Sequence, residues 1–337
     1  IWIANKGGGL RSFAHRFSTA MQLFTPVALP PAPFRLTPVS RVLTLGSCFA
    51  QHIGQHIAAA LPDGHALVNP FGPLYAPQVI AHHLRLLLDT APLPDSTYFE
   101  GVEGMWHNRW FSTHVSSAEF ATCRRLTTDA LSAARDLLRR ADVLVLTLGT
   151  DRCYRLPDGL LVANCHKQPA ATFTEHAADV ETLTSDLRCA LDSLRALRPE
   201  LQVVWTVSPY RYAKYGLHAS QLAKARLLLA VDALCATDER SVYFPAYELL
   251  LDELRDYRYY ARDLLHPSDT AVELIGERFA DWCFAPTLHT FARERARLLR
   301  AHQHRPLHPE SDAHRAFRAK LRHEAELFKA KWGFSPF

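Results

Sequence analysis

Residues 42–50 read VLTLGSCFA, an apolar run that is followed at once by a Gly-Ser pair and then by a helical pattern. In α/β proteins such a junction brings a serine to the carboxyl end of a buried strand, where ligands bind. The N–H of Ser47 would then lie at the positive end of the next helix, which stabilises a negatively charged oxygen. Ser47 is therefore a candidate nucleophile, provided that the chain also supplies a base and a group that orients the base.

Apolar runs and helical patterns alternate along much of the chain. Five short apolar runs are typical of buried parallel strands: 42–45, 66–68, 143–148, 203–207 and 242–244. The helical patterns cover residues 48–61, 77–88, 128–140, 174–197, 220–236 and 270–284. This alternation predicts right-handed crossovers and a doubly wound five-stranded parallel sheet, an α/β fold with helices on both faces.

Two stretches do not follow the alternation of apolar runs and helical patterns: residues 92–117 and the residues after 286. Residues 92–117 are irregular and crowded with aromatic and histidine side chains. They form either a loop that lines the substrate site or a hairpin packed on the sheet edge, and the pattern favours neither. Further helices are expected at 287–303 and 311–331. We therefore expect a main domain over residues 21–286 and a helical appendage over 287–337.

Composition and charge exclude several classes of protein. The chain has 337 residues, of which 48% are hydrophobic and 21% charged, which is ordinary globular composition. Its net charge of +4 arises mainly near the C-terminus, and we interpret that excess as solvated basic helices, with no nucleic acid as partner. No apolar stretch approaches the roughly 18 residues of a membrane span, so no membrane partner is expected.

Cysteine usage and the N-terminal stretch bear on the compartment. The seven cysteines are scattered without a C-x-x-C pair, which favours a reducing, cytoplasmic environment over a disulfide framework. Residues 1–20 carry three basic side chains and no acid, and Met21 opens a well-patterned segment. We interpret residues 1–20 as a leader or non-native extension outside the fold.

A D-x-x-H sequence supplies the partners that Ser47 needs. Asp263 and His266 lie three residues apart, just ahead of the last core helix. The carboxylate can accept a hydrogen bond from one imidazole nitrogen while the other nitrogen faces Ser47. On its own D-x-x-H is more often a capping or surface feature. Together with the junction at Ser47 it predicts a catalytic triad of Ser47, Asp263 and His266.

The chain resembles the GSCFA-domain family over roughly residues 21–310. The family signature is GSCFA at 46–50, and further matching segments are NPFG at 69–72, TLGT at 147–150, NCHK at 164–167, VSP at 207–209, YFPAYE at 243–248, DYRYY at 256–260 and DLLHPS at 263–268. That family is similar to the SGNH, or GDSL-like, hydrolases. The resemblance implies a flavodoxin-like sheet, Ser47 as nucleophile, Asp263 and His266 as its partners, and the N–H groups of Ser47 and Gly72 as oxyanion donors.

One block departs from that pattern. SGNH enzymes have Gly-x-Asn after the third strand, whereas this chain has Gly149-Thr150-Asp151. An ionised Asp151 would repel an oxyanion, so we expect its side chain to point elsewhere. Either Thr150 or Asn164 could replace the missing amide donor, and we prefer Asn164. Without a replacement the transition state would lose about 2.7–4 kcal/mol.

Three polar residues complete the candidate substrate site. Thr150 follows the third strand, and His166 lies in the NCHK loop. Arg211 follows Val207-Ser208-Pro209, where it is either a substrate clamp or one half of an ion pair. We predict that Thr150, His166 and Arg211 contact the substrate.

Other candidate sites are weaker. His52 and His56 are spaced to face one side of a helix, but no third ligand is evident, so no metal site is predicted. Cys48 is an alternative nucleophile, although the first helical turn directs it away from the strand edge. The preferred hypothesis is a cofactor-independent serine esterase acting on an O-acyl ester of a carbohydrate or small polar molecule. The alternatives are an O-acyltransferase with the same triad and a non-catalytic binding module.

Overall fold

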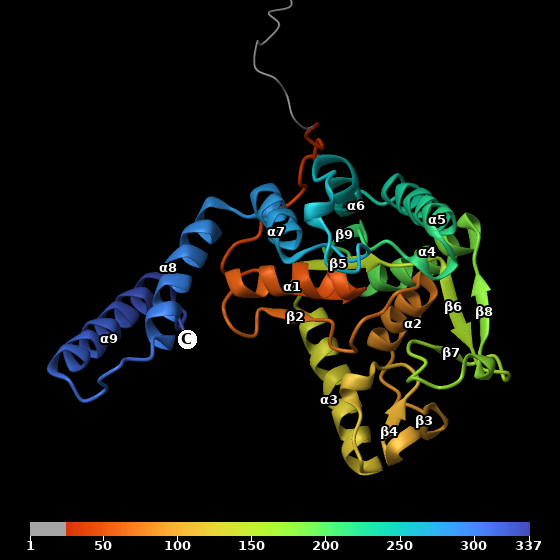
Figure 1. Ribbon diagram of the computed structural model, residues 1–337, viewed down its shortest axis with the longest axis horizontal. Helices are drawn as coiled ribbons and strands as arrows, with labels where there is room; N and C mark the ends of the chain where they lie inside the picture. The colour runs from red at the N-terminus through yellow and green to blue at the C-terminus, as the bar shows by residue number, and fades with distance from the viewer. Residues whose placement is uncertain (1–24) are drawn as a thin grey trace, which may run out of the picture.

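The computed structural model describes residues 25–337, so the predicted leader at 1–20 lies outside the described residues. Its centre is a parallel sheet of β1 (Val42–Gly46), β2 (Ala66–Val68), β5 (Val143–Leu148), β9 (Gln202–Val207) and β10 (Ser241–Tyr243). The strand order is β10-β9-β5-β1-β2 (Figure 1). With the five strands counted along the chain, this is the flavodoxin-like order 2-1-3-4-5, so the predicted fold is confirmed. The switch point, where such folds bind ligands, lies between β1 and β5.

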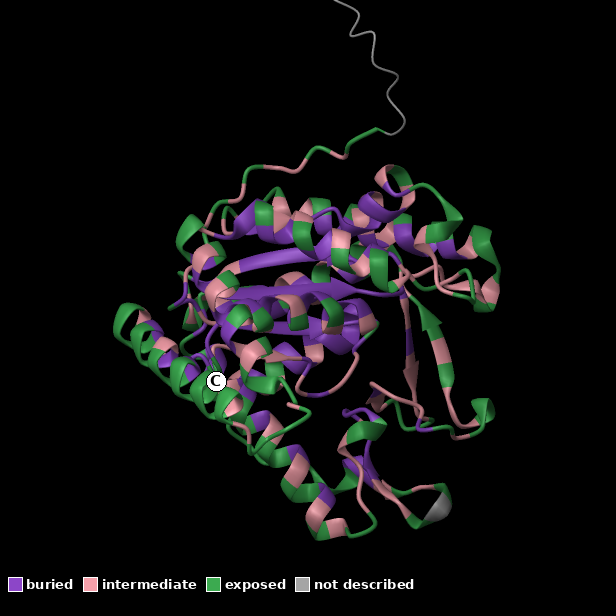
Figure 2. Cartoon of the chain, turned by 60° about the vertical axis from the view of Figure 1, so that its left-hand side comes forward, coloured by how far each residue is buried: buried purple, intermediate pink, exposed green. Residues whose placement is uncertain are grey.

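Helices cover both faces of this sheet, and Figure 2 shows the buried strands between them. Successive strand residues point to opposite faces. Leu43 and Leu45 of β1 join the core formed with α2, α3, α4 and α5, whereas Val42 joins the core formed with α1 and α7. These helices span Cys48–Ala60 (α1), Pro77–Leu88 (α2), Phe120–Leu138 (α3), Val180–Leu197 (α4), Leu217–Cys235 (α5) and Asp269–Cys283 (α7).

The aromatic stretch at 92–117 forms a hairpin. Its strands β3 (Tyr98–Glu100) and β4 (Trp106–Asn108) pair in antiparallel fashion. Tyr98 donates to or accepts from Thr127 of α3 through its hydroxyl at 2.7 Å, and Trp106 lies edge-on against Phe120. The hairpin reading is therefore confirmed, but the hairpin packs on α3 and not on the sheet edge.

A second small sheet was missed by the sequence patterns. Strands β6 (Arg152–Arg155), β7 (Leu161–Val162) and β8 (Thr174–Ala177) pair in the order β7-β6-β8. The helix predicted over residues 174–197 begins only at Val180, so the prediction is wrong for residues 174–177. The side chains of β8 are mostly exposed or half-buried, so they lack the apolar run by which a strand is recognised.

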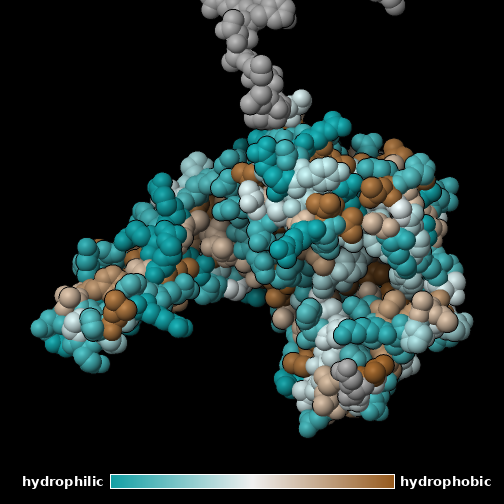
Figure 3. All heavy atoms as spheres, viewed as in Figure 1, coloured by the Kyte–Doolittle hydropathy of each residue, from teal (hydrophilic) through white to brown (hydrophobic). Residues whose placement is uncertain are grey.

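Two long helices follow the sheet, as predicted: α8 (Pro286–Gln303) and α9 (Asp312–Trp332). They project from the body as an arm whose surface is largely hydrophilic (Figures 1 and 3). The base of the arm is firmly attached, because Phe291 lies in the core with α1 and the guanidinium of Arg295 donates to Leu61 O at 2.9 Å. Within residues 25–337 no helix is both long and apolar enough to cross a membrane.

Candidate active site

A cavity of about 360 Å³ opens at the carboxyl ends of β1, β5 and β9, between α2 and the small sheet. Four of the predicted site residues line it: Ser47, Thr150, Asn164 and His266. The remaining lining residues come from α1, the start of α2, β6, β7, the loops after β5, β7 and β9, and the turn before α7: Cys48, Phe49, His52, Tyr75, Ala76, Val79, Gly149, Arg152, Cys153, Tyr154, Val162, Ala163, Cys165, Ser208, Tyr210, Tyr212 and Pro267.

The turn from β1 into α1 holds Ser47 at the wall of this cavity. Gly46 has φ +144°, and a Cβ there would lie 2.3 Å from the carbonyl oxygen of Thr147, so only glycine fits. Ser47 is the N-cap of α1, and its Oγ accepts a hydrogen bond from the N–H of Phe49 at 3.3 Å. The hydroxyl therefore sits at the positive end of α1, where developing negative charge is stabilised.

The D-x-x-H turn orients its histidine as the sequence predicted. One carboxylate oxygen of Asp263 lies 2.5 Å from Nδ1 of His266, and the other accepts the N–H groups of Leu265 and His266 at 2.9 and 3.0 Å. These bonds, first of all the one from the His266 ring, lower the pKa of Asp263 to about 2. The ring of Tyr210 lies 4.3 Å from the His266 ring. With Nδ1 engaged, Nε2 is the nitrogen left for proton transfer.

Ser47 and His266 line one cavity, yet within the described residues no hydrogen bond joins them. Catalytic hydrogen bonds commonly tighten only when substrate binds. The triad therefore stays a prediction, with its base and acid already paired.

Arg211 contacts the D-x-x-H turn and does not line the cavity. Its backbone N–H donates to Leu265 O at 3.0 Å, and its guanidinium donates to Leu264 O at 3.2 Å. Leu264 has φ +57°, a conformation that L residues rarely adopt without support. Within residues 25–337 Arg211 forms no ion pair, and its predicted substrate contact stays a prediction that the cavity lining does not support. Its guanidinium also lies 5.2 Å from the centre of the Tyr260 ring, so the contacts of Arg211 are those of a residue that holds the D-x-x-H turn in place.

The three predicted oxyanion donors differ in their availability. The N–H of Ser47 donates to Thr147 O at 3.1 Å, and the N–H of Gly72 donates to Asn69 O at 2.8 Å. Gly72 borders a neighbouring hollow instead of the main cavity. Asn164 does line the cavity, and its Oδ1 accepts the N–H of His166 at 2.8 Å, while its Nδ2 has no acceptor in the described part of the chain. The amide of Asn164 is thus the donor least committed elsewhere.

Asp151 points away from the cavity, as predicted. Its carboxylate is fully buried and lies 2.6 Å from the guanidinium of Arg226 on α5. Thr150, by contrast, lines the cavity, and its Oγ1 accepts the N–H of Arg152 at 3.3 Å. The partner of Asp151 could not be found from sequence, because Arg226 lies 75 residues further along the chain.

His166 does not reach the cavity wall. Its Nε2 lies 3.1 Å from Asn108 O, and its ring lies 4.5 Å from the ring of His107. Burial, with His107 adding to it, lowers the pKa of His166 to about 4, so the ring is neutral at pH 7. The predicted substrate contact of His166 stays a prediction that the cavity lining does not support, and the side chain ties the NCHK loop to the hairpin.

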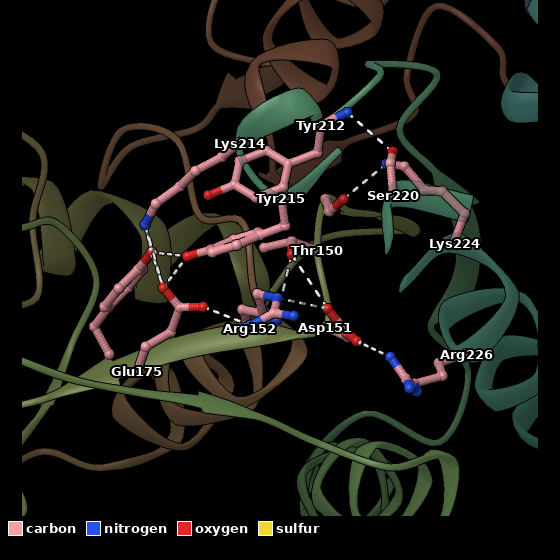
Figure 4. A network of polar contacts seen from close by, with 12 residues as sticks. Thr150, Asp151, Arg152, Glu175, Tyr212, Lys214, Tyr215, Ser220, Lys224 and Arg226 are labelled. Atoms are coloured by element: carbon pink, nitrogen blue, oxygen red, sulfur yellow. Dashed lines mark hydrogen bonds and ion pairs between the residues drawn. The ribbon is translucent and has the colours of Figure 1, made fainter. Parts of the chain in front are cut away.

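A charged network at the cavity rim was missed by the sequence patterns (Figure 4). Glu175 of β8 accepts from Arg152 at 2.6 Å, from Tyr154 at 2.9 Å and from Lys214 at 3.2 Å, and it also accepts from Tyr215. Burial raises its pKa, but these donors outweigh burial and lower the pKa to about 2. The network joins the small sheet to the loop after β9.

A buried lysine lies behind the same strand ends. Lys224 of α5 is 1% exposed, and its Nζ donates to Gly149 O at 2.7 Å and to Ser208 O at 2.8 Å. Burial lowers its pKa to about 7. Both acceptors belong to residues of the cavity wall, so Lys224 braces the ends of β5 and β9.

No group of three or more His, Cys, Asp or Glu side chains within residues 25–337 is arranged to hold a metal ion. His52, one of the pair considered for a metal, lies in the cavity wall, where burial lowers its pKa.

Comparison with known proteins gives one family match. The model of the GSCFA family matches residues 41–279. No curated protein matches the chain. Among solved structures, an acetyl esterase mutant with acetate ion is 11% identical, with a TM-score of 0.37. A carbohydrate esterase family 3 protein from Talaromyces cellulolyticus is 10% identical, with a TM-score of 0.34. Each similarity covers 76% of this chain and 99% of the other.

Proposed function

The chain belongs to the GSCFA family, and we propose that it is a serine hydrolase that cleaves an O-acyl ester. The observation that carries the proposal is the shared cavity: Ser47, at the positive end of α1, and His266, paired with Asp263, both line it. A nucleophile, a base and an orienting acid are the parts that acyl transfer requires.

In the proposed reaction, Nε2 of His266 takes the proton of Ser47 Oγ as that oxygen bonds to the ester carbonyl carbon. Asp263 stabilises the resulting imidazolium. The carbonyl C–O bond to the alcohol then breaks, and the alcohol leaves with the proton from His266. Water, deprotonated by His266, attacks the acyl-enzyme, releases the carboxylic acid and restores the Ser47 hydroxyl.

The amide of Asn164 is the proposed first donor to the oxyanion, since Asn164 lines the cavity and its Nδ2 has no acceptor in the described residues. The N–H groups of Ser47 and Gly72 can contribute if their present hydrogen bonds are exchanged on substrate binding. The N-terminus of α1 adds electrostatic stabilisation of the oxyanion beside Ser47.

Labelling with a fluorophosphonate tests the nucleophile directly. We expect the folded wild-type protein to take up one label, with fragmentation of the modified peptide locating it on Ser47 and not on Cys48. Ser47→Ala should abolish both labelling and esterase activity. Ser193→Ala, an exposed serine on α4, is the matched control and should label normally. Undiminished esterase activity in Ser47→Ala would defeat the proposal.

A binding module is the second candidate. It is favoured by the absence of a hydrogen bond between Ser47 and His266 and by the engaged backbone donors of Ser47 and Gly72. Failure of the folded protein to label would support it.

If labelling succeeds, supplying the ester with and without sugar acceptors separates hydrolysis from acyl transfer, because the product is either a free acid or a new ester.

A further inference from the structure

Part of the cavity wall is apolar. Five small or aliphatic side chains line it, from the start of α2, from β6 and from the end of β7: Ala76, Val79, Cys153, Val162 and Ala163. Of these, Val79, Cys153 and Val162 are at most 4% exposed. None of the five carries a hydroxyl or amide group, so this wall offers no strong side-chain hydrogen bond to a ligand.

Two tyrosines of the cavity lie beside the candidate triad, whereas the hydroxyl of a third, Tyr154 on β6, donates to Glu175 at 2.9 Å. Tyr210 lies against the His266 ring at 4.3 Å, and the Tyr75 hydroxyl lies 3.0 Å from Sγ of Cys48, the neighbour of Ser47. The cavity therefore combines polar groups at the reacting residues with a set of apolar side chains from α2, β6 and β7.

No uncompensated fixed charge faces the cavity. Among its lining residues, all of which lie in the described part of the chain, Arg152 alone carries a permanent charge. Its guanidinium is 2.6 Å from Glu175 and 3.9 Å from Asp151, and it lies 4.1 Å from the centre of the Tyr215 ring. A charged ligand group would have to break these contacts or remain unpaired, which is costly in a buried site.

We propose that this cavity holds the acyl group of the substrate, and that this group is uncharged, apolar and longer than acetyl. The inference rests on the proposed esterase function. A cavity of about 360 Å³ is far larger than an acetyl group needs, since the three non-hydrogen atoms of that group fill roughly the space of three water molecules, about 90 Å³. A sugar ring is disfavoured at the apolar wall, because each hydroxyl group buried there would lose its hydrogen bonds. The alcohol half of the ester is then left for the polar part of the cavity beside the candidate triad.

Chain-length kinetics test the assignment. With p-nitrophenyl esters from acetyl to octanoyl, kcat/KM should rise about fourfold for each added methylene until the cavity is filled, which corresponds to about 0.8 kcal/mol. Ala163→Phe, which places a ring in the cavity, should lower the ratio of kcat/KM for the hexanoyl ester to that for the acetyl ester at least tenfold. Ala313→Phe, at an exposed position of α9, is the matched control and should keep the wild-type chain-length profile.

A binding series separates this inference from the esterase proposal. Methyl esters of the same acyl chains are titrated calorimetrically into Ser47→Ala, which cannot form the acyl-enzyme. Affinity that rises with chain length supports the acyl site even if no ester is turned over. Hydrolysis that is fastest for acetyl, with no chain-length dependence of binding, would overturn the acyl site and leave the esterase proposal standing.

Discussion

Lys224 makes the stability of the protein depend on pH in a way that can be calculated. Its Nζ has two acceptors, Gly149 O and Ser208 O, at 2.7 and 2.8 Å. A neutral amine has two N–H groups and matches these carbonyls, whereas an ammonium has a third. Burial accordingly lowers the pKa of Lys224 from its ordinary value of 10.5 to about 7. We predict that Lys224→Met removes a pH-dependent part of the free energy of unfolding.

The sign follows from proton linkage. Because the pKa is lower in the folded state, the unfolded chain binds the proton more readily, and stability falls as the pH drops from about 10 to 7. The difference between the pKa of Lys224 in the unfolded chain and in the folded protein corresponds to about 5 kcal/mol of unfolding free energy, at about 1.36 kcal/mol per pKa unit. Between pH 9 and pH 7, where Lys224 of the unfolded chain is protonated and that of the folded chain is only becoming so, the change is about 2 kcal/mol.

Urea unfolding followed by tryptophan fluorescence measures this change. The stability of the wild type relative to Lys224→Met should be about 2 kcal/mol greater at pH 9 than at pH 7. Lys214→Met is the matched control: Lys214 is about half exposed, and a hydrogen bond with Tyr215 raises its pKa, so its contribution is fully present at both pH values. If the free energies of unfolding of the wild type and Lys224→Met differed by the same amount at pH 7 and at pH 9, the reasoning would be refuted.

Three further predictions concern the candidate site. Asn164→Ala should lower kcat by about 10²–10³ without changing the circular dichroism spectrum, and an unchanged kcat would remove Asn164 from the oxyanion site. Gly72→Ala should destabilise the protein by about 1–3 kcal/mol in urea unfolding, because φ is +79° and the new Cβ would lie 2.0 Å from Ser112 Oγ. Gly64→Ala, with φ +76° and open space, should cost less, and equal costs would exclude the clash. Arg211→Ala should lower kcat more than it changes KM, because it frees the D-x-x-H turn; a rise in KM alone would instead favour a direct substrate contact.

Local patterns predicted the framework well. Each of the five sheet strands begins or ends within one residue of its apolar run, because a strand buried on both faces needs continuous apolar residues. The local conformations around Ser47, Asp263 and His266 could likewise be predicted from neighbouring residues. A Gly-Ser pair between a strand and a helix, and a turn closed by hydrogen bonds to Asp263, depend on neighbours within a few residues.

Helix starts were less predictable where polar residues supply the first turns. The helix expected at 128–140 begins at Phe120, and residues 174–177, expected to be helical, form β8 instead. Strand β8 is stabilised by its antiparallel pairing with β6. Nothing in the four residues of β8 predicts that pairing.

Residues 42–50 by themselves determined the strand, the turn and the helix cap at Ser47, since a buried run, a glycine and a capping hydroxyl act over a few bonds. Only the tertiary structure decided what surrounds that serine. The small sheet and the start of α2 supply the apolar side chains of the cavity, Arg226 binds the carboxylate of Asp151 away from it, and Lys224 braces two strand ends. These contacts join groups from 16 to 75 residues apart. Their energies come from burial and hydrogen bonding between distant segments, which arise only when the sheet has brought those segments together.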